Sequence, residues 1–314
     1  MKLRGIEFEN VLGASGVEGF FGEGYWYHKP FKKIGLDFSN MTFVAKTVTL
    51  DSWAGNMPLK EDYTPEEFIP SCVKARPFQG LLLNAVDLSN PGLARLLGLG
   101  RWQARQKPFW LSVMSAASTP AAREEELRRM VDLLIAYKDE FAAPFGLQIN
   151  LSCPNTGRDP RVLIGESARV LDIASDLDVP LMPKFSIASA PIGAILELGR
   201  HPACDSVCFS NTLPYNWQGY GQKAFGKEKS PLAHMGGGGL SGALLKPLVC
   251  EYIFRLRDRG FTRPINGGGG ILCKGDVDDY RKAGASSIFL GSVASLRPWR
   301  VKGIIRHANS LEWN

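Results

Sequence analysis

Short apolar runs alternate with segments of helical periodicity along most of this chain, and this order constrains the fold most strongly. Parallel strands are usually connected by helices, so the alternation predicts a parallel sheet covered by helices. Eight such strands are most economically closed into a (β/α)₈ barrel; an open doubly wound sheet is the alternative. The apolar runs lie at residues 41–48, 80–85, 108–114, 145–151, 180–186, 206–211, 263–266 and 286–291. The helical segments lie at residues 65–75, 120–136, 165–175, 191–198, 242–258 and 275–283.

Other local signals agree with a barrel. Thr119 is placed to cap the helix at residues 120–136, and no Gly-x-Gly-x-x-Gly pattern follows the first apolar run. Residues 3–12 predict a short hairpin that plugs the bottom of the barrel. Residues 212–239 show no helical periodicity and predict a long loop after the sixth strand, which in compact domains is usually a lid or a substrate loop. No linker divides the 314 residues, so we expect one domain over residues 1–314.

Composition excludes several classes of protein. Hydrophobic residues make up 45% and charged residues 22%, which is typical of a soluble globular protein. The apolar runs are shorter than the ~20 residues of a membrane span, and the first residues lack the apolar core of a signal peptide. The net charge of +6 is scattered, which argues against nucleic-acid binding. Six cysteines without a CxxC pair and four histidines predict neither a disulfide framework nor a metal site, so we expect a cytoplasmic protein.

The polar residues at the strand ends indicate the chemistry, because a (β/α)₈ barrel gathers its active site at the carboxyl ends of its strands. They are amides, hydroxyls, two lysines and one cysteine, without the paired carboxylates of a glycosidase or the ligand cluster of a metallohydrolase. These residues are Lys46, Thr47, Asn84, Ser112, Asn150, Cys153, Asn155, Lys184, Asn211 and Thr212.

The run Asn150-Leu151-Ser152-Cys153-Pro154-Asn155 places two amides around a thiol just after a strand. Amides suit a planar ligand edge that alternates carbonyl and N–H groups. A partly desolvated thiol near cations can act as a base near neutral pH, so Cys153 is the candidate base. The remaining cysteines are interpreted as small buried hydrophobic residues; these are Cys72, Cys204, Cys208, Cys250 and Cys273.

Glycine-rich turns follow the last two strands. Residues 267–270 are four consecutive glycines, and Gly291-Ser292 follows the next strand, where barrels commonly bind phosphate through backbone N–H groups. Residues 238–242 add further backbone donors. Lys46 and Lys184 are flanked by apolar residues, and such a lysine could form a Schiff base or stay charged beside a flavin.

Taken together, these motifs resemble the FMN-dependent dihydroorotate dehydrogenases over roughly residues 8–294. The matching segments, in chain order, are Gly13-Ala14-Ser15-Gly16, Ala45-Lys46-Thr47, Asn84 with Asn90-Pro91-Gly92, Ser112-Val113-Met114-Ser115-Ala116, the Asn150–Asn155 run, Pro183-Lys184, Ser210-Asn211-Thr212, Gly239-Leu240-Ser241-Gly242 and the two phosphate turns.

The resemblance implies FMN as cofactor and (S)-dihydroorotate as substrate, oxidised to orotate in pyrimidine biosynthesis. Cys153 would remove the C5 proton while the C6 hydride passes to flavin N5, and Lys46 would stabilise the anionic reduced flavin. A cysteine at this position is similar to the soluble class. The implied cofactor contacts are Ala14, Ser15, Gly16, Lys46, Thr47, Ser112, Asn150, Lys184, Ser210, Gly242, Gly269, Gly270, Gly291 and Ser292. The implied substrate contacts are Lys46, Asn84, Asp87, Leu88, Asn150, Asn155, Asn211 and Thr212.

The chain departs from the family pattern near the implied carboxylate site. The family usually has Met-Gly-Leu-Pro-Asn where this chain has Val86-Asp87-Leu88-Ser89-Asn90, and Leu59-Lys60 stands where an arginine is usual. Asp87 would repel a substrate carboxylate if it faces the pocket unpaired and would cost little if it points to solvent. A related cyclic ureide without a carboxylate is therefore an alternative substrate, and a flavin-free lyase using Lys184 is another alternative. The resemblance further implies a homodimer and a soluble electron acceptor, either fumarate-like or reached through a partner subunit.

Overall fold

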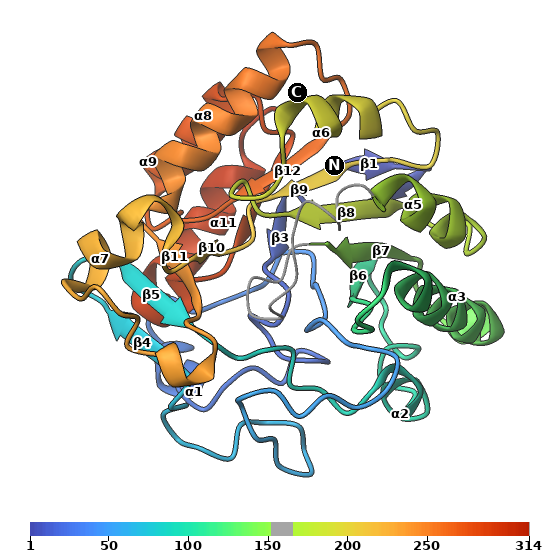
Figure 1. Ribbon diagram of the computed structural model, residues 1–314, viewed down its shortest axis with the longest axis horizontal. Helices are drawn as coiled ribbons and strands as arrows, with labels where there is room; N and C mark the ends of the chain where they lie inside the picture. The colour runs from blue at the N-terminus through green and yellow to red at the C-terminus, as the bar shows by residue number, and fades with distance from the viewer. Residues whose placement is uncertain (152–165, 314) are drawn as a thin grey trace.

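A parallel sheet forms the centre of the computed structural model, which describes residues 1–151 and 166–313. Seven strands are hydrogen-bonded in the order β3-β13-β12-β9-β8-β7-β6 (Figure 1). They are β3 (Val11–Gly13), β6 (Phe109–Val113), β7 (Phe145–Asn150), β8 (Leu181–Phe185), β9 (Val207–Phe209), β12 (Ile265–Gly268) and β13 (Ser287–Leu290). Every residue of these strands is buried, as expected for a sheet covered on both faces.

Residues 42–48 close this sheet into a barrel. Thr42 forms a parallel bridge with Leu12 of β3, and Val44 forms one with Trp110 of β6. The N–H of Thr42 donates to the carbonyl of Val11 at 2.8 Å, and the N–H of Trp110 donates to the carbonyl of Phe43 at 3.0 Å. Residues 42–48 thus take the place of the eighth strand, although they pair with β3 and β6 only through isolated bridges. The predicted (β/α)₈ barrel is confirmed.

Helices surround the strands, and the longest of them connect consecutive strands (Figure 1). The N-cap at Thr119 is confirmed, because its side chain accepts a hydrogen bond from the N–H of Ala122 at 3.3 Å. The helices are α1 (His28–Phe31), α2 (Leu93–Leu97), α3 (Pro120–Tyr137), α5 (Ser167–Ser175), α6 (Ile192–Leu198), α7 (Tyr220–Phe225), α8 (Leu245–Asp258), α9 (Lys274–Lys282), α10 (Val293–Leu296) and α11 (Val301–Asn309). Single 3₁₀ turns are η1 (Lys138–Glu140), η3 (Trp217–Gly219), η4 (Ala233–Met235) and η5 (Pro298–Arg300).

A second, antiparallel sheet lies beside the barrel and corrects two predictions. Its order is β10-β11-β5-β4, with β10 (Leu213–Pro214), β11 (Gly239–Gly242), β5 (Leu81–Asn84) and β4 (Val73–Arg76). The apolar run at residues 80–85 is therefore not a barrel strand; β3 takes that place. The helix predicted at residues 65–75 is wrong, because Pro70 cannot donate within a helix and Val73–Arg76 pairs with β5 instead.

The segment at residues 212–239 is not a featureless loop. It contains η3, α7 and η4, and its two ends pair as β10 and β11. Gly219 and Gly226 bound α7 with φ of +73° and +67°, a conformation that glycine adopts readily. The Arg76 guanidinium donates to the carbonyls of Ala224 at 3.0 Å and Phe225 at 2.9 Å, which satisfies the end of this helix. The segment thus carries helical order that its glycine-rich sequence did not indicate.

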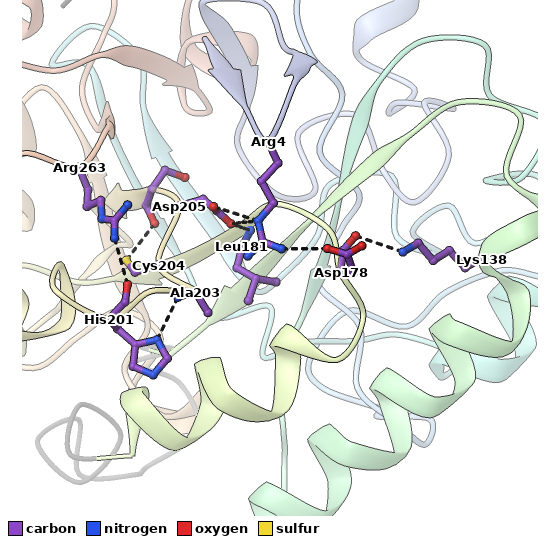
Figure 2. A network of polar contacts seen from close by, with 10 residues as sticks. Arg4, Lys138, Asp178, Leu181, His201, Ala203, Cys204, Asp205 and Arg263 are labelled. Atoms are coloured by element: carbon purple, nitrogen blue, oxygen red, sulfur yellow. Dashed lines mark hydrogen bonds and ion pairs between the residues drawn. The ribbon is translucent and has the colours of Figure 1, made fainter.

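The amino-terminal hairpin plugs the bottom of the barrel, as predicted, but it is shorter than the expected residues 3–12, because Val11–Gly13 forms β3. Strands β1 (Lys2–Leu3) and β2 (Ile6–Glu7) pair, and the buried side chains of Leu3 and Phe8 pack against Trp110 in the barrel interior. Arg4 fixes the hairpin from outside by pairing with Asp178 at 3.3 Å and Asp205 at 2.9 Å (Figure 2). None of the helices in the described ranges is long and apolar enough to cross a membrane.

Candidate active site

A cavity of about 300 Å³ opens at the carboxyl ends of the barrel strands and is roofed by β5 and the residues near β11. Most of the predicted site residues line it, although they come from segments far apart in the sequence. These are Ala14, Ser15, Gly16, Lys46, Thr47, Asn84, Asp87, Leu88, Asn150, Lys184, Ser210, Asn211, Thr212, Gly269, Gly270, Gly291 and Ser292.

The other predicted site residues lie elsewhere. Ser112 is buried behind the cavity wall, where its Oγ lies 2.9 Å from the Oγ1 of Thr47. Gly242 lies at the end of β11, packed against the backbone of Gly80. Cys153 and Asn155 lie outside the described residues, so the candidate base stays a prediction.

Backbone N–H groups form an anion-binding turn at one end of the cavity. Among the described residues, the N–H groups of Gly269, Gly270, Gly291 and Ser292 find no protein acceptor. Gly269 and Gly270 have φ of +120° and +75°, and a Cβ on Gly270 would lie 2.5 Å from the carbonyl oxygen of Gly242. The turn therefore needs glycine, and it offers unused donors to a phosphate group. Gly267 and Gly268 belong to β12 and not to this turn.

Two buried lysines bring positive charge to the cavity. Lys46 is 8% exposed; its Nζ donates to the carbonyl of Ser89 and lies 4.9 Å from the ring centroid of Phe20. Lys184 is 7% exposed, and its Nζ lies 5.7 Å from the ring centroid of Phe289. Because apolar surroundings screen charge poorly, both ammonium groups act strongly on a ligand in the cavity.

Hydroxyl and amide groups complete the floor. The Oγ of Ser15 lies 2.6 Å from the Oγ1 of Thr47, which continues to Ser112. On the opposite side, the Asn211 amide donates to the Asn150 side-chain oxygen at 3.3 Å and accepts from the N–H of Thr212 at 2.9 Å. These groups offer donors and acceptors without charge, which suits a planar heterocycle.

Two tyrosines that the sequence did not single out also line the cavity. The rings of Tyr25 and Tyr27 are stacked with centroids 5.4 Å apart. The hydroxyl of Tyr25 donates to the carbonyl of Gly16 at 2.7 Å, and that of Tyr27 lies 3.1 Å from the Oγ of Ser295. Burial raises the pKa of both phenols, so they stay neutral. The aromatic run at residues 25–27 was the available signal, but it is too short to distinguish a cavity wall from core.

Of the five cysteines interpreted as buried hydrophobic residues, Cys72, Cys204 and Cys208 are buried as predicted, whereas Cys250 and Cys273 are only partly buried. Burial raises the pKa of Cys72 to about 11 and that of Cys208 to about 12. Both thiols therefore stay protonated near neutral pH and cannot act as bases or nucleophiles there. Among the described residues, no group of three or more His, Cys, Asp or Glu could hold a metal ion.

Comparison with protein families identifies the chain. The sequence model of the family described as dihydroorotate dehydrogenase matches residues 1–311. The chain belongs to the dihydroorotate dehydrogenase family. The catalytic subunit of dihydroorotate dehydrogenase B (NAD(+)) from Listeria welshimeri is 28% identical over 309 residues, which cover 95% of this chain and 88% of that protein. The subunit of the same name from Anoxybacillus flavithermus is 26% identical over 322 residues, which cover 99% of this chain and 90% of that protein.

The solved structures show the same barrel. The ligand-free DHODH from Eimeria tenella superposes with a TM-score of 0.69 at 18% identity, covering 100% of this chain and 89% of that chain. The resemblance to the dihydroorotate dehydrogenase family that the motifs predicted is confirmed, and the chain is an oxidoreductase of that family.

Asp87 stands where the dihydroorotate dehydrogenase family usually has glycine, and the structure shows where its side chain lies. Asp87 lines the cavity together with Asn84 and Leu88, so it does not simply point away into solvent. Its Oδ2 accepts a hydrogen bond from the indole N–H of Trp53 at 3.5 Å. Asp87 and Leu88 both have positive φ, +54° and +60°, which holds this turn against the cavity mouth.

Proposed function

We propose that the chain binds FMN and oxidises (S)-dihydroorotate to orotate in pyrimidine biosynthesis. The observation that carries the proposal is the cavity itself, in which a turn of unused N–H donors, two buried lysines and a set of amides face one space. The family assignment supports the reaction, since both relatives compared above are named as dihydroorotate dehydrogenase catalytic subunits.

The residues present fit FMN. The N–H groups of Gly269, Gly270, Gly291 and Ser292 would hold its phosphate, because they lack protein acceptors among the described residues. Lys46 and Lys184 would lie against the ring system and the ribityl chain, with further contacts from the walls at Ala14–Gly16 and Ser210. When bound, FMN would supply a hydride acceptor.

The residues of this chain would bind and deprotonate the substrate. Asn84, Asn150, Asn211 and Thr212 would hold the pyrimidine ring through its carbonyl and N–H groups, with Asn155 as a further contact outside the described residues. Cys153 would remove the C5 proton. Lys46 would place positive charge where negative charge collects during hydride transfer, and its burial makes that charge effective.

Asp87 favours a second candidate, a dihydropyrimidine or cyclic ureide without a carboxylate. A carboxylate at the cavity wall disfavours an anionic substrate and favours one that presents N–H groups. Anaerobic mixing of the FMN-loaded protein with dihydroorotate and, separately, with dihydrouracil distinguishes the two. We expect faster loss of the oxidised-flavin absorbance with dihydroorotate; loss with dihydrouracil alone would select the second candidate.

The setting of the reaction is part of the same proposal. We place the protein in the cytoplasm as a single-domain homodimer that passes electrons to a soluble acceptor, fumarate-like or reached through a partner subunit. The names of the relatives support the partner route, since they are called catalytic subunits. Absorbance of the purified protein is the first test, because a protein without flavin bands that cannot be loaded with FMN would refute the proposal.

A further inference from the structure

A second cavity, of about 490 Å³, lies beside the candidate active site and is outside the barrel interior. Its size falls in the range of small-molecule sites. Unlike the first cavity, its wall is dominated by ionisable side chains, which are Glu18, Glu23, His28, Lys32, Asp37, Arg105 and Lys107.

Arg105 brings a cation with unused donors to this cavity. Its guanidinium lies 3.9 Å from the ring centroid of Phe43, and its Nη1 donates to the carbonyl of Phe21 at 3.0 Å. That is its one hydrogen bond to the described residues, and its Nε is buried without a partner among them. A guanidinium has five N–H donors and keeps its charge at neutral pH. Most of its donor capacity is therefore left for a ligand.

The carboxylates that line the cavity differ in how many hydrogen bonds and ion pairs they already make. Glu23 accepts from the N–H groups of Phe20 at 2.8 Å and Phe21 at 2.7 Å. Asp37 accepts from the N–H of Ser39 and pairs with Lys302 at 3.2 Å. The side-chain carboxyl of Glu18 makes neither a hydrogen bond nor an ion pair with any described residue, and only its backbone carbonyl is bonded, by the N–H of Gly24.

Glu18 is also poised to lose its charge near neutral pH. Burial raises the pKa of its carboxyl to about 7; Arg105 opposes this and Glu23 adds to it. Lys32 and Lys107, which are both exposed, also line this cavity. When Glu18 carries a proton, the cationic side chains that line the cavity outnumber its remaining carboxylates, so the charge balance is positive; the cations are Lys32, Arg105 and Lys107, and the carboxylates are Glu23 and Asp37.

We propose that this second cavity binds a small organic oxyanion, with Arg105 as its main hydrogen-bond donor and Glu18 setting the affinity. Carboxylates and phosphates share the required chemistry, since both accept paired N–H bonds from a guanidinium. His28 adds no positive charge, because burial lowers its pKa to about 4 and its Nδ1 accepts from the N–H of Tyr25 at 3.3 Å.

The same chain segment forms walls of both cavities, so we expect occupation of one to affect the other. Residues 14–17, Tyr25 and Tyr27 face the first cavity, whereas Glu18, residues 22–24 and His28 face the second. The segment is fastened internally: the N–H of Gly24 donates to the carbonyl of Glu18 at 2.8 Å, and the N–H of Lys46 donates to that of Gly19 at 3.0 Å. An anion that orders this segment should slow FMN release. This coupling rests on the proposed function, whereas the binding does not.

Calorimetric titration with malonate tests the binding on FMN-saturated protein. Malonate is chosen because its carboxyl groups stay ionised between about pH 6.5 and 8.5, where Glu18 changes charge. Asp37, with a pKa lowered to about 2, and His28 do not titrate in this window. We expect saturable binding that weakens about tenfold as the pH rises through 7.

Three variants locate the site. Glu18→Gln should bind about tenfold more tightly than wild type at high pH and lose the pH dependence, and Arg105→Gln should bind at least tenfold more weakly. Glu251→Gln, on the exposed face of α8, is the charge-matched control and should behave as wild type. Absence of saturable malonate binding to the wild type would overturn the proposal. So would a Glu18→Gln titration that matches the Glu251→Gln control, and this comparison can be made even if Arg105→Gln does not fold. The rate of FMN release with and without malonate tests the coupling separately, and an unchanged rate refutes it.

Discussion

Replacement of Ser292 by glutamate should weaken FMN binding through charge alone. Ser292 lies in the turn whose N–H groups lack protein acceptors, and its side chain makes no capping bond at the start of α10, so its loss costs the fold little. A carboxylate about 6 Å from a doubly charged phosphate experiences about 5 kcal/mol of repulsion at an effective dielectric constant of about 20. Because Ser292 is partly exposed, solvent and salt reduce this repulsion to about 2 kcal/mol. The FMN dissociation constant should therefore rise roughly thirtyfold.

Quenching of FMN fluorescence during titration of the apoprotein measures this constant, and Ser292→Gln is the control of matched size. We expect Ser292→Gln to bind FMN nearly as wild type, and the defect of Ser292→Glu to shrink in high salt. Equal binding by the two variants would show that the phosphate does not lie at this turn. Gly270 is a poorer position for this test, because any side chain there collides with the carbonyl of Gly242.

Four further predictions concern the candidate base, the cavity wall, a buried ion pair and the second cavity. Cys153→Ala should leave FMN bound and reducible by dithionite while substrate-driven reduction falls by a factor of about 10² or more in stopped-flow absorbance; an unchanged rate would remove Cys153 as the base. Asp87→Asn should tighten orotate binding about tenfold in flavin-shift titrations if the proposed substrate is right, and an unchanged constant would show that residue 87 does not meet the carboxylate. Arg123→Leu should lower urea-unfolding stability by about 3–5 kcal/mol, because it strands Glu166, whose carboxylate lies 2.6 Å from Arg123 at 5% exposure; a loss below about 1 kcal/mol would contradict this. The pKa of Glu18 is raised from 4.5 in the unfolded chain to about 7 in the folded protein, so the folded protein binds a proton more tightly. Wild type should therefore lose stability relative to Glu18→Gln as the pH rises from 4.5 to about 7. Urea midpoints that change in parallel for the two proteins would refute this prediction.

The barrel was predictable because most of its strands are continuous apolar runs with helices between them. Two strand assignments failed for opposite reasons. Residues 11–13 form barrel strand β3 but are too few to show a period, whereas Leu81–Asn84 is as apolar as a barrel strand yet pairs with β4 and β11 beside the barrel. Sequence periodicity reports burial, and it does not report which sheet a buried strand joins.

The candidate site was predictable where strand ends carry unusual polar residues, such as Lys46, Asn150 and Lys184. Tyr25 and Tyr27 were missed because nothing in a short aromatic run indicates that a loop folds back over a cavity. The direction of Asp87 was open from sequence alone, since it depends on a turn with positive φ at two successive non-glycine residues. The second cavity is formed by residues 18–43 with Arg105 and Lys107, and no local pattern brings these together.

The most direct test of the account is a single-turnover reaction of FMN-loaded protein with dihydroorotate in the absence of oxygen, with the product identified by chromatography. We expect one orotate to form for each flavin that loses its oxidised absorbance. Flavin that stays oxidised in the presence of dihydroorotate, in protein that dithionite still reduces, would contradict it.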